Sequence, residues 1–272
     1  MHAFATVARV ADPVTKDGYV LAFEGGFGGA ELDARRWLPY HLPHWSSRAQ
    51  AAARYALGDG VLRLRVEADQ PPWCPEFDGD VRVSSLQTGV FAGAVGSGVG
   101  QHRFTPVAVV REAQDNRRLY APQYGVIETR LRALADPHCM VALWMIGYED
   151  VPERSAEICV CEIFGSQVRP DGALVGMGVH PFGDPGISDE FEKVEVGVDV
   201  RDVHVYTAEW TPEYVAFYVD GTRRKVVRQS PSYPMQLMLG IYEFGGPHAA
   251  DRYPKEFVVD DVRGYRPAAA GP

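Results

Sequence analysis

The chain has 272 residues and a formal charge of −9, from 27 basic and 36 acidic side chains. This acidic balance argues against a general nucleic-acid or anionic-membrane surface, since both need clustered Lys and Arg. A charged fraction of 23% and a hydrophobic fraction of 46% are typical of a folded protein and exclude intrinsic disorder. We therefore expect a folded chain that has neither a nucleic acid nor a membrane as its partner.

Short strands are predicted along most of the chain. Residues 61–67 and 125–134 alternate between apolar and polar side chains, which is typical of strands with one buried face. Residues 139–147 form an apolar run that is too short for a typical helix and predicts a buried strand. One helix is expected over residues 46–57, where Ala and Arg are frequent.

The clearest local signal is a hairpin over residues 214–227. Its centre is Asp220-Gly221, a pair that suits a type I′ turn because both central residues take a positive φ. Residues 237–244 and 257–265 predict two further strands.

The Gly-rich and then polar segment 88–118 is expected to be a long loop or insertion, because strands are predicted on both sides of it. The regular spacing of short strands and turns indicates a single all-β domain over residues 1–272, with its core at about 20–266. The expected architecture is a sandwich of two antiparallel sheets with a concave cleft across one of them.

Two glutamates in one apolar strand are the most informative feature of the sequence. Glu157 and Glu162 lie five positions apart in EICVCEIFG, where an unpaired charge is costly. Positions five apart face opposite sides of a flat strand, but a β-bulge at Val160-Cys161 would bring both carboxylates to one face. Paired carboxylates about 5–5.5 Å apart can perform retaining glycoside hydrolysis. The competing interpretation is two exposed glutamates on an edge strand.

Several segments resemble glycoside hydrolase family 16, the laminarinase-type β-jelly roll, and they occur in the order of that family. The EICVCEIFG strand is similar to the family motif E-x-D-x-x-E, which is often followed by an aromatic residue and Gly. The other similar segments are 27–37 (FGGAELDARRW), 124–130 (YGVIETR), 141–147 (VALWMIG), 203–212 (VHVYTAEWTP), 217–221 (FYVDG) and 257–265 (FVVDDVRGY).

This resemblance implies a retaining β-glycosidase that acts inside a chain, most like an endo-β-1,3-glucanase. Glu157 would be the nucleophile, and Glu162 would be the general acid and base. The motif departs from the family at Cys159, where the family has an Asp that hydrogen-bonds the nucleophile. A thiol is a weak hydrogen-bond partner. The alternative function is therefore a protein of the same fold that binds a carbohydrate or another small ligand without cleaving it, or a repurposed biosynthetic enzyme.

The resemblance also implies residues that contact the ligand or a metal. Trp144 would form a platform beneath a sugar ring, and His180 would line the cleft. Trp210 and Glu243 are further candidates, although the family has no Glu at the position of Glu243. Asp260 aligns with a ligand of structural calcium in many members. No organic cofactor is implied.

The four cysteines lack the paired spacing of a zinc site, and we expect them to be free thiols. The amino-terminal residues carry no basic start followed by an apolar stretch, so a cytoplasmic location is expected unless an export signal has been removed. The chain is expected to act as a monomer with a carbohydrate or other small molecule as its partner.

Overall fold

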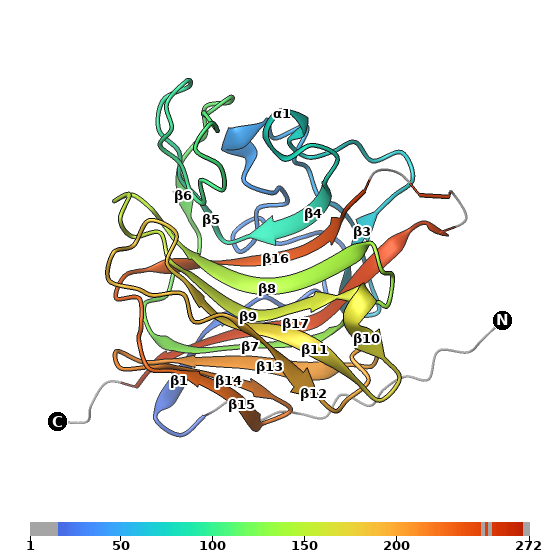
Figure 1. Ribbon diagram of the computed structural model, residues 1–272, viewed down its shortest axis with the longest axis vertical. Helices are drawn as coiled ribbons and strands as arrows, with labels where there is room; N and C mark the ends of the chain where they lie inside the picture. The colour runs from blue at the N-terminus through green and yellow to red at the C-terminus, as the bar shows by residue number, and fades with distance from the viewer. Residues whose placement is uncertain (1–15, 246–247, 250–251, 269–272) are drawn as a thin grey trace.

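Two antiparallel sheets lie face to face in the computed structural model, which describes residues 16–245, 248–249 and 252–268 (Figure 1). This arrangement confirms the predicted jelly-roll sandwich. The amino-terminal residues 1–15, on which the expectation about an export signal depends, lie outside the described residues. No helix within the described ranges is long and apolar enough to cross a membrane.

One sheet has eight strands and carries the outer hairpin of the fold. Its order is β15 (Thr222–Val227), β14 (Val215–Val219), β13 (His204–Trp210), β7 (Gly125–Arg132), β17 (Lys255–Pro267), β3 (Val61–Val66) and β2 (Arg54–Gly58), with β1 (Tyr19–Glu24) paired to β17. In the hairpin, Asp220 and Gly221 have φ values of 49° and 72°, as the predicted type I′ turn requires.

The other sheet has seven strands and carries the paired glutamates. Its order is β10 (Val168–Arg169), β11 (Gly172–His180), β9 (Glu157–Phe164), β8 (Cys139–Gly147), β16 (Met235–Glu243) and β4 (Arg82–Gln87), with β12 (Glu192–Val196) paired to β11. Each central strand therefore has an inner face toward the other sheet and an outer face that is available for a site.

The main hydrophobic core fills the space between the sheets, and a second cluster lies on the outer face of the seven-stranded sheet. This second cluster joins Trp144 and Tyr242 of the sheet to Trp45, Trp73 and Val110 of the loops. The loops also contain the short elements η1 (Pro43–Trp45), α1 (Pro75–Asp78), β5 (Gly89–Val90) and β6 (Arg117–Arg118), while η2 (Gly165–Gln167) follows β9. In Figure 1, α1 lies above β4, while β5 and β6 lie above β16 and to the left of β4. The loops therefore cover one side of the outer face.

The helix expected over residues 46–57 is wrong. Residues 48–51 form turns, Ala52 bridges to Tyr40, and β2 begins at Arg54 and pairs with β3. Backbone pairing to a neighbouring strand outweighs the weak helical preference of an Ala-rich segment.

The predicted long loop at residues 88–118 contains the β5–β6 pair and packs onto the sheet through Ala92, Ala108 and Val110.

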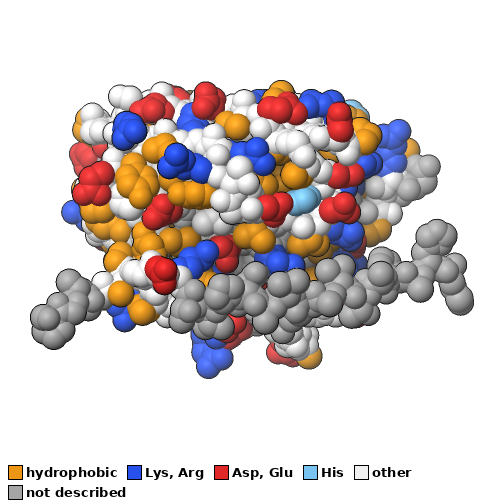
Figure 2. All heavy atoms as spheres, turned by 90° about the horizontal axis from the view of Figure 1, so that it is seen from below, with side chains coloured by type: hydrophobic (Ala, Val, Ile, Leu, Met, Phe, Trp, Pro, Cys, Tyr) orange, Lys and Arg blue, Asp and Glu red, His pale blue; other side chains and the backbone are white. Residues whose placement is uncertain are grey.

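The end of the molecule near β14 and β15 has a mixed surface. Figure 2 shows this end, where acidic and basic side chains alternate with apolar ones across the part formed by described residues. Such intermixing is typical of a solvated face.

Candidate active site

The side chains of β9 alternate between the core and the outer face of the sheet, and this alternation is interrupted once. Ile158 and Ile163 belong to the core between the sheets, and so do the adjacent residues Val160 and Cys161. In the register with β8, Trp144 pairs with Cys159 and the next residue back, Leu143, pairs with Cys161, so Val160 is skipped. This is the predicted β-bulge, in which two residues oppose one on the partner strand.

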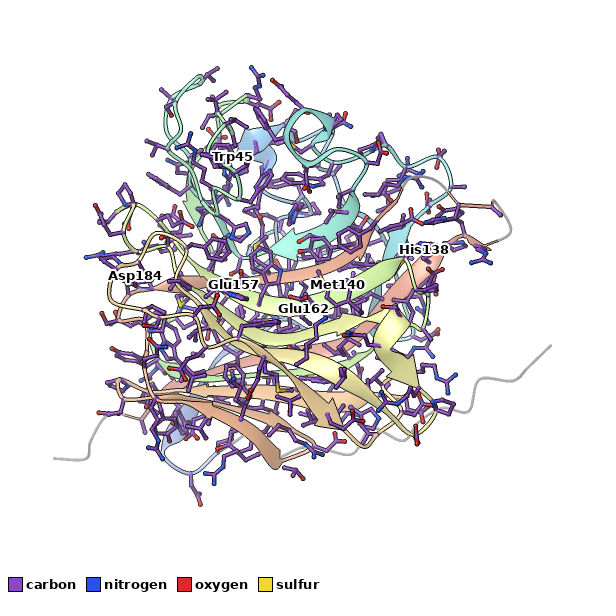
Figure 3. The ribbon with its side chains drawn as sticks, in the orientation of Figure 1. Trp45, His138, Met140, Glu157, Glu162 and Asp184 are labelled. Carbon is purple, nitrogen blue, oxygen red and sulfur yellow. The ribbon has the colours of Figure 1, made fainter. Side chains whose placement is uncertain are left out.

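The bulge returns Glu162 to the face that Glu157 and Cys159 occupy. All three side chains line one pocket on the outer face of the seven-stranded sheet. Figure 3 shows Glu157 and Glu162 together over the middle of this sheet, with Met140 beside them and Trp45 in the loops above. The interpretation as two exposed glutamates on an edge strand is therefore wrong, since β9 lies between β8 and β11.

The pocket has a volume of about 220 Å³. Its floor comes from alternate residues of β8 and β9 and from Tyr242 of β16, and its far wall comes from loops. The lining residues are His41, Leu42, Trp73, Asp78, His102, Phe104, Met140, Ala142, Trp144, Glu157, Cys159, Glu162 and Tyr242. Carboxylates thus lie beside an aromatic surface, a combination suited to a sugar ring.

The two glutamates have different environments. Glu157 is 8% exposed, and burial, followed by the nearby Glu162 and Asp189 charges, raises its pKa to about 8. Glu162 is more exposed, and burial also raises its pKa, while Lys193 and His180 oppose this shift. Because the charge of Glu162 acts on Glu157, the two carboxyl groups titrate as a coupled pair. The pair can therefore hold one proton near neutral pH, which is the state that acid-assisted nucleophilic attack requires.

Cys159 lies between the glutamates on the same face and is 1% exposed. Its Sγ approaches the carbonyl oxygen of Gly176 at 3.8 Å, which is a weak contact. Burial, followed by the charges of Glu157 and Glu162, raises the pKa of this thiol well above its ordinary value. Cys159 is therefore a neutral neighbour of Glu157. All four cysteines of the chain are buried and free.

His180 lies next to Glu157 across the β11–β9 pair. Its Nδ1 donates a hydrogen bond to Asp189 Oδ2 at 3.0 Å, and its ring stacks on Phe191 at 4.6 Å. Gly176 makes room for the Phe191 ring, because a Cβ at this position would lie 2.4 Å from Phe191. His180 thus lies beside Glu157 but is not among the residues that line the pocket, and Phe191 is an additional neighbour that sequence reasoning missed.

Trp144 lines the pocket, as expected, but Trp210 does not. Trp210 belongs to β13 of the other sheet, is 1% exposed and packs in the core between the sheets. Its Nε1 donates hydrogen bonds to Ser230 Oγ and Pro231 O. The expected contact of Trp210 with a sugar is therefore wrong, because the sheet itself separates it from the pocket.

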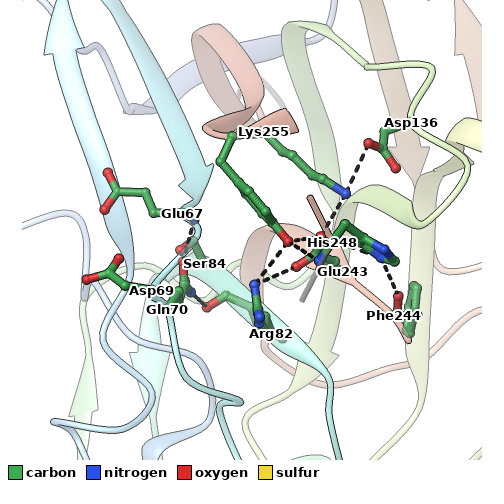
Figure 4. Close-up of polar contacts among 12 residues, drawn as sticks. Glu67, Asp69, Gln70, Arg82, Ser84, Asp136, Glu243, Phe244, His248 and Lys255 are labelled. Atoms are coloured by element: carbon green, nitrogen blue, oxygen red, sulfur yellow. Dashed lines mark hydrogen bonds and ion pairs between the residues drawn. The ribbon is translucent and has the colours of Figure 1, made fainter. Parts of the chain in front are cut away.

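Glu243 also lies away from the pocket. It is fully buried, and its carboxylate contacts Arg82 Nη1 at 3.1 Å, Lys255 Nζ at 2.7 Å and the Tyr253 hydroxyl at 2.9 Å. Asp136 extends the cluster through Lys255 (Figure 4). The expected role in ligand binding is wrong, because both carboxylate oxygens are already engaged by groups of the fold.

The surroundings of Asp260 do not fit a calcium ion. Its carboxylate lies 3.0 Å from Arg130 Nε, and this guanidinium supplies the charge that a cation would bring. The described residues contain no group of three or more His, Cys, Asp or Glu side chains that could hold a metal. Calcium binds through six to eight oxygen ligands, so a single paired carboxylate is insufficient.

Residues on the loops complete the pocket, and sequence reasoning assigned none of them to it. Trp73 donates from Nε1 to Asp78 Oδ2 at 2.6 Å, and the ring of His41 meets that of Trp73 edge-on at 4.6 Å. His102 and Phe104 come from the long loop. The only sequence signal was the rigid Pro-rich surroundings of Trp73, which are compatible with either a pocket rim or a core cap.

Comparison with known proteins gives a family for this geometry. The model for glycosyl hydrolases family 16 matches residues 118–257, which is more than half of the chain. The chain belongs to this family. The match includes β7, β8, β9, β13 and β16, and therefore both glutamates. No curated protein sequence matches the chain significantly.

Three solved structures have a similar fold. The GlcNAcα1-4Gal-releasing endo-β-galactosidase from Clostridium perfringens is 30% identical with a TM-score of 0.83, over 96% of this chain and 65% of that one. The laminarinase from Flavobacterium sp. UMI-01 is 18% identical (TM-score 0.63), over 90% of this chain and 100% of that one. The endo-β-1,3-glucanase from Pyrococcus furiosus is 20% identical (TM-score 0.62), over 93% and 96%.

Proposed function

We propose that the protein is a retaining glycoside hydrolase that cleaves a β-galactosidic bond in an oligosaccharide or polysaccharide. The observation that carries the proposal is the bulge at Val160, which turns Glu157 and Glu162 into one pocket. Family membership and the aromatic lining of the pocket support the same reaction.

In the reactive state the proton that the pair shares lies on Glu162, so that ionised Glu157 attacks the anomeric carbon while Glu162 protonates the leaving oxygen. A covalent glycosyl-enzyme forms, and Glu162 then removes a proton from the water that hydrolyses it. The different exposure of the two residues suits these roles. Glu157 is deeply buried beneath the sugar, whereas Glu162 lies closer to solvent, from which water enters.

A galactoside is favoured over a β-1,3-glucan by the comparison of structures. The endo-β-galactosidase matches with a TM-score of 0.83, whereas the two glucanases above reach 0.63 and 0.62. The likeness to the glucanases, at 18% and 20% identity, concerns the fold. We therefore place the β-galactoside first and the β-1,3-glucan second.

The test is hydrolysis of three aryl β-glycosides, those of GlcNAcα1-4Gal, galactobiose and laminaribiose, with the product anomer followed by NMR. The proposal expects release from a galactose-containing probe with the β-anomer formed first. Cleavage of the laminaribiose probe alone would favour the glucanase. Activity that persists in Glu157→Gln, or no cleavage of any probe by a folded protein, would contradict the proposal and favour a binding protein.

A further inference from the structure

Two histidines from the loops line the pocket, and each has a ring nitrogen that the described residues leave unpaired. His41 and His102 both line it, and His41 is 4% exposed. The Nδ1 atoms of both rings are buried and have no hydrogen-bond partner in the described part of the chain. A buried polar atom without a partner is costly, so such atoms in a pocket wall indicate that a ligand supplies the missing bond.

The two imidazoles flank the tryptophan on the pocket floor. The ring centroid of His102 lies 4.9 Å from that of Trp144, and the centroid of His41 lies 6.3 Å from it on a different loop. His41 also meets Tyr242 edge-on at 5.5 Å. The Trp144 side chain and the Tyr242 hydroxyl interact with each other through a hydrogen bond. Two imidazole nitrogens without a partner in the described ranges therefore lie beside one apolar surface.

His102 is held firmly in this position by its neighbours. Its backbone N–H donates to Glu149 Oε1 at 2.6 Å, and its ring meets Phe182 edge-on at 4.6 Å. The preceding residue, Gln101, donates from Nε2 to Gln236 Oε1 of β16 at 2.7 Å. The side chain is thus oriented before any ligand arrives, and preorganised groups of this kind give specificity.

The pocket wall is uncharged at neutral pH, whereas the floor is acidic. Burial is the main cause that lowers the pKa of His41 to about 3 and that of His102 to about 4. A neutral imidazole offers one donor and one acceptor, which matches a hydroxyl or an amide. Among the described residues that line the pocket there is no Lys or Arg, while Asp78, Glu157 and Glu162 are present.

We propose that His41 and His102 are specificity-determining residues that hydrogen-bond the hydroxyl or amide groups of an uncharged sugar, and that the pocket excludes anionic sugars such as sulfated ones. The inference rests on the proposed function, since it names the substrate class of the same site. A sulfate here would lose its hydration and meet carboxylates, while the nearby Lys193 is not part of the pocket lining and already interacts with Glu162. Both histidines lie outside residues 118–257, so the family match does not assign them.

Binding to the inactive variant Glu157→Gln separates this inference from the reaction itself. The ligands are free GlcNAcα1-4Gal, galactobiose and laminaribiose, each with its 6-sulfated form, measured by calorimetry. We expect the best neutral disaccharide to bind at least 10-fold more tightly than its sulfated form. Adding His102→Phe or His41→Phe, which keep a ring but remove the polar atoms, should weaken neutral binding by about 10- to 100-fold.

Two controls distinguish recognition from packing. His102→Gln restores a donor and an acceptor and should recover most of the binding, while His138→Phe, outside the pocket, should leave it unchanged. Equal or tighter binding of the sulfated forms, unchanged binding in both His→Phe variants, or no binding of any disaccharide would overturn the inference. Binding that follows these expectations without hydrolysis by the wild type would contradict the proposed reaction alone.

Discussion

Glu157 and Glu162 are five positions apart in the chain and line the same pocket, because Val160 is skipped in the pairing of β9 with β8. One extra residue therefore converts an arrangement with carboxylates on opposite faces into one with both on the same face. At the bulge, the consecutive residues Val160 and Cys161 both pack into the core between the sheets. The predictions below depend on this relationship and on the groups around it.

Glu162→Gln should separate substrates by their leaving group. With an oligosaccharide, loss of the general acid should lower kcat/KM by about 10²- to 10⁴-fold. With a dinitrophenyl glycoside, whose leaving group needs no proton, the first step should change little. Glu153→Gln, an exposed acidic residue, is the matched control. Equal losses on both substrates would argue against this role for Glu162.

Glu157→Gln should stabilise the protein increasingly as the pH rises. The folded state raises the pKa of Glu157 from 4.5 to about 8, so it keeps a proton that the unfolded state releases near pH 4.5. The wild type therefore loses stability through this group between pH 4.5 and 8. The variant should gain roughly 2–4 kcal/mol in free energy of unfolding over that range.

Denaturant unfolding at several pH values measures this difference. Glu153→Gln should follow the wild type throughout, because its carboxylate is exposed. Parallel curves for the wild type and Glu157→Gln would show that Glu157 titrates normally in the folded state.

Cys159→Asp should raise the hydrolytic rate. A carboxyl group at this position can hydrogen-bond Glu157 more strongly than the thiol, whose one nearby acceptor lies 3.8 Å away. We expect a higher kcat on the best-cleaved probe, with Cys159→Ser as the control of similar size. A folded Cys159→Asp protein with an unchanged or lower rate would mean that the thiol has a role of its own.

Glu243→Gln should destabilise the fold and leave substrate binding intact. The change leaves Arg82 and Lys255 buried without their shared carboxylate, which typically costs about 3–5 kcal/mol. Glu256→Gln, which breaks a more exposed pair with Arg65, should cost no more than about 1 kcal/mol. Thermal unfolding gives both values. A large increase in KM well below the melting temperature would return Glu243 to the ligand site.

Local pattern predicted the strands and the bulge well, because both depend on alternation within a few residues. It failed where a distant partner decides the outcome. Nothing near Glu243 in sequence indicates Arg82, which lies 161 positions away. The sequence around Trp210 is equally compatible with a cleft residue and a core residue, because the facing sheet determines whether Trp210 is buried.

The loop histidines could not have been predicted by the same means. The position of His102 depends on the contact of Gln101 with Gln236, which is 135 positions away, and on Glu149. A sequence read locally shows His102 only as one polar residue in a Gly-rich loop. The spacing of Glu157 and Glu162 therefore predicted the acid pair. No local feature of the sequence predicted the loop histidines on the opposite wall of the pocket.

The separation of the pocket into strands and loops has an evolutionary consequence. The carboxylates belong to β9, whose geometry leaves little room for change, whereas His41 and His102 belong to connections outside the family match. Loops tolerate substitution and insertion far better than central strands. Substitutions in residues 98–106 can therefore change which glycan a descendant of this protein binds. The catalytic pair on β9 is kept unchanged.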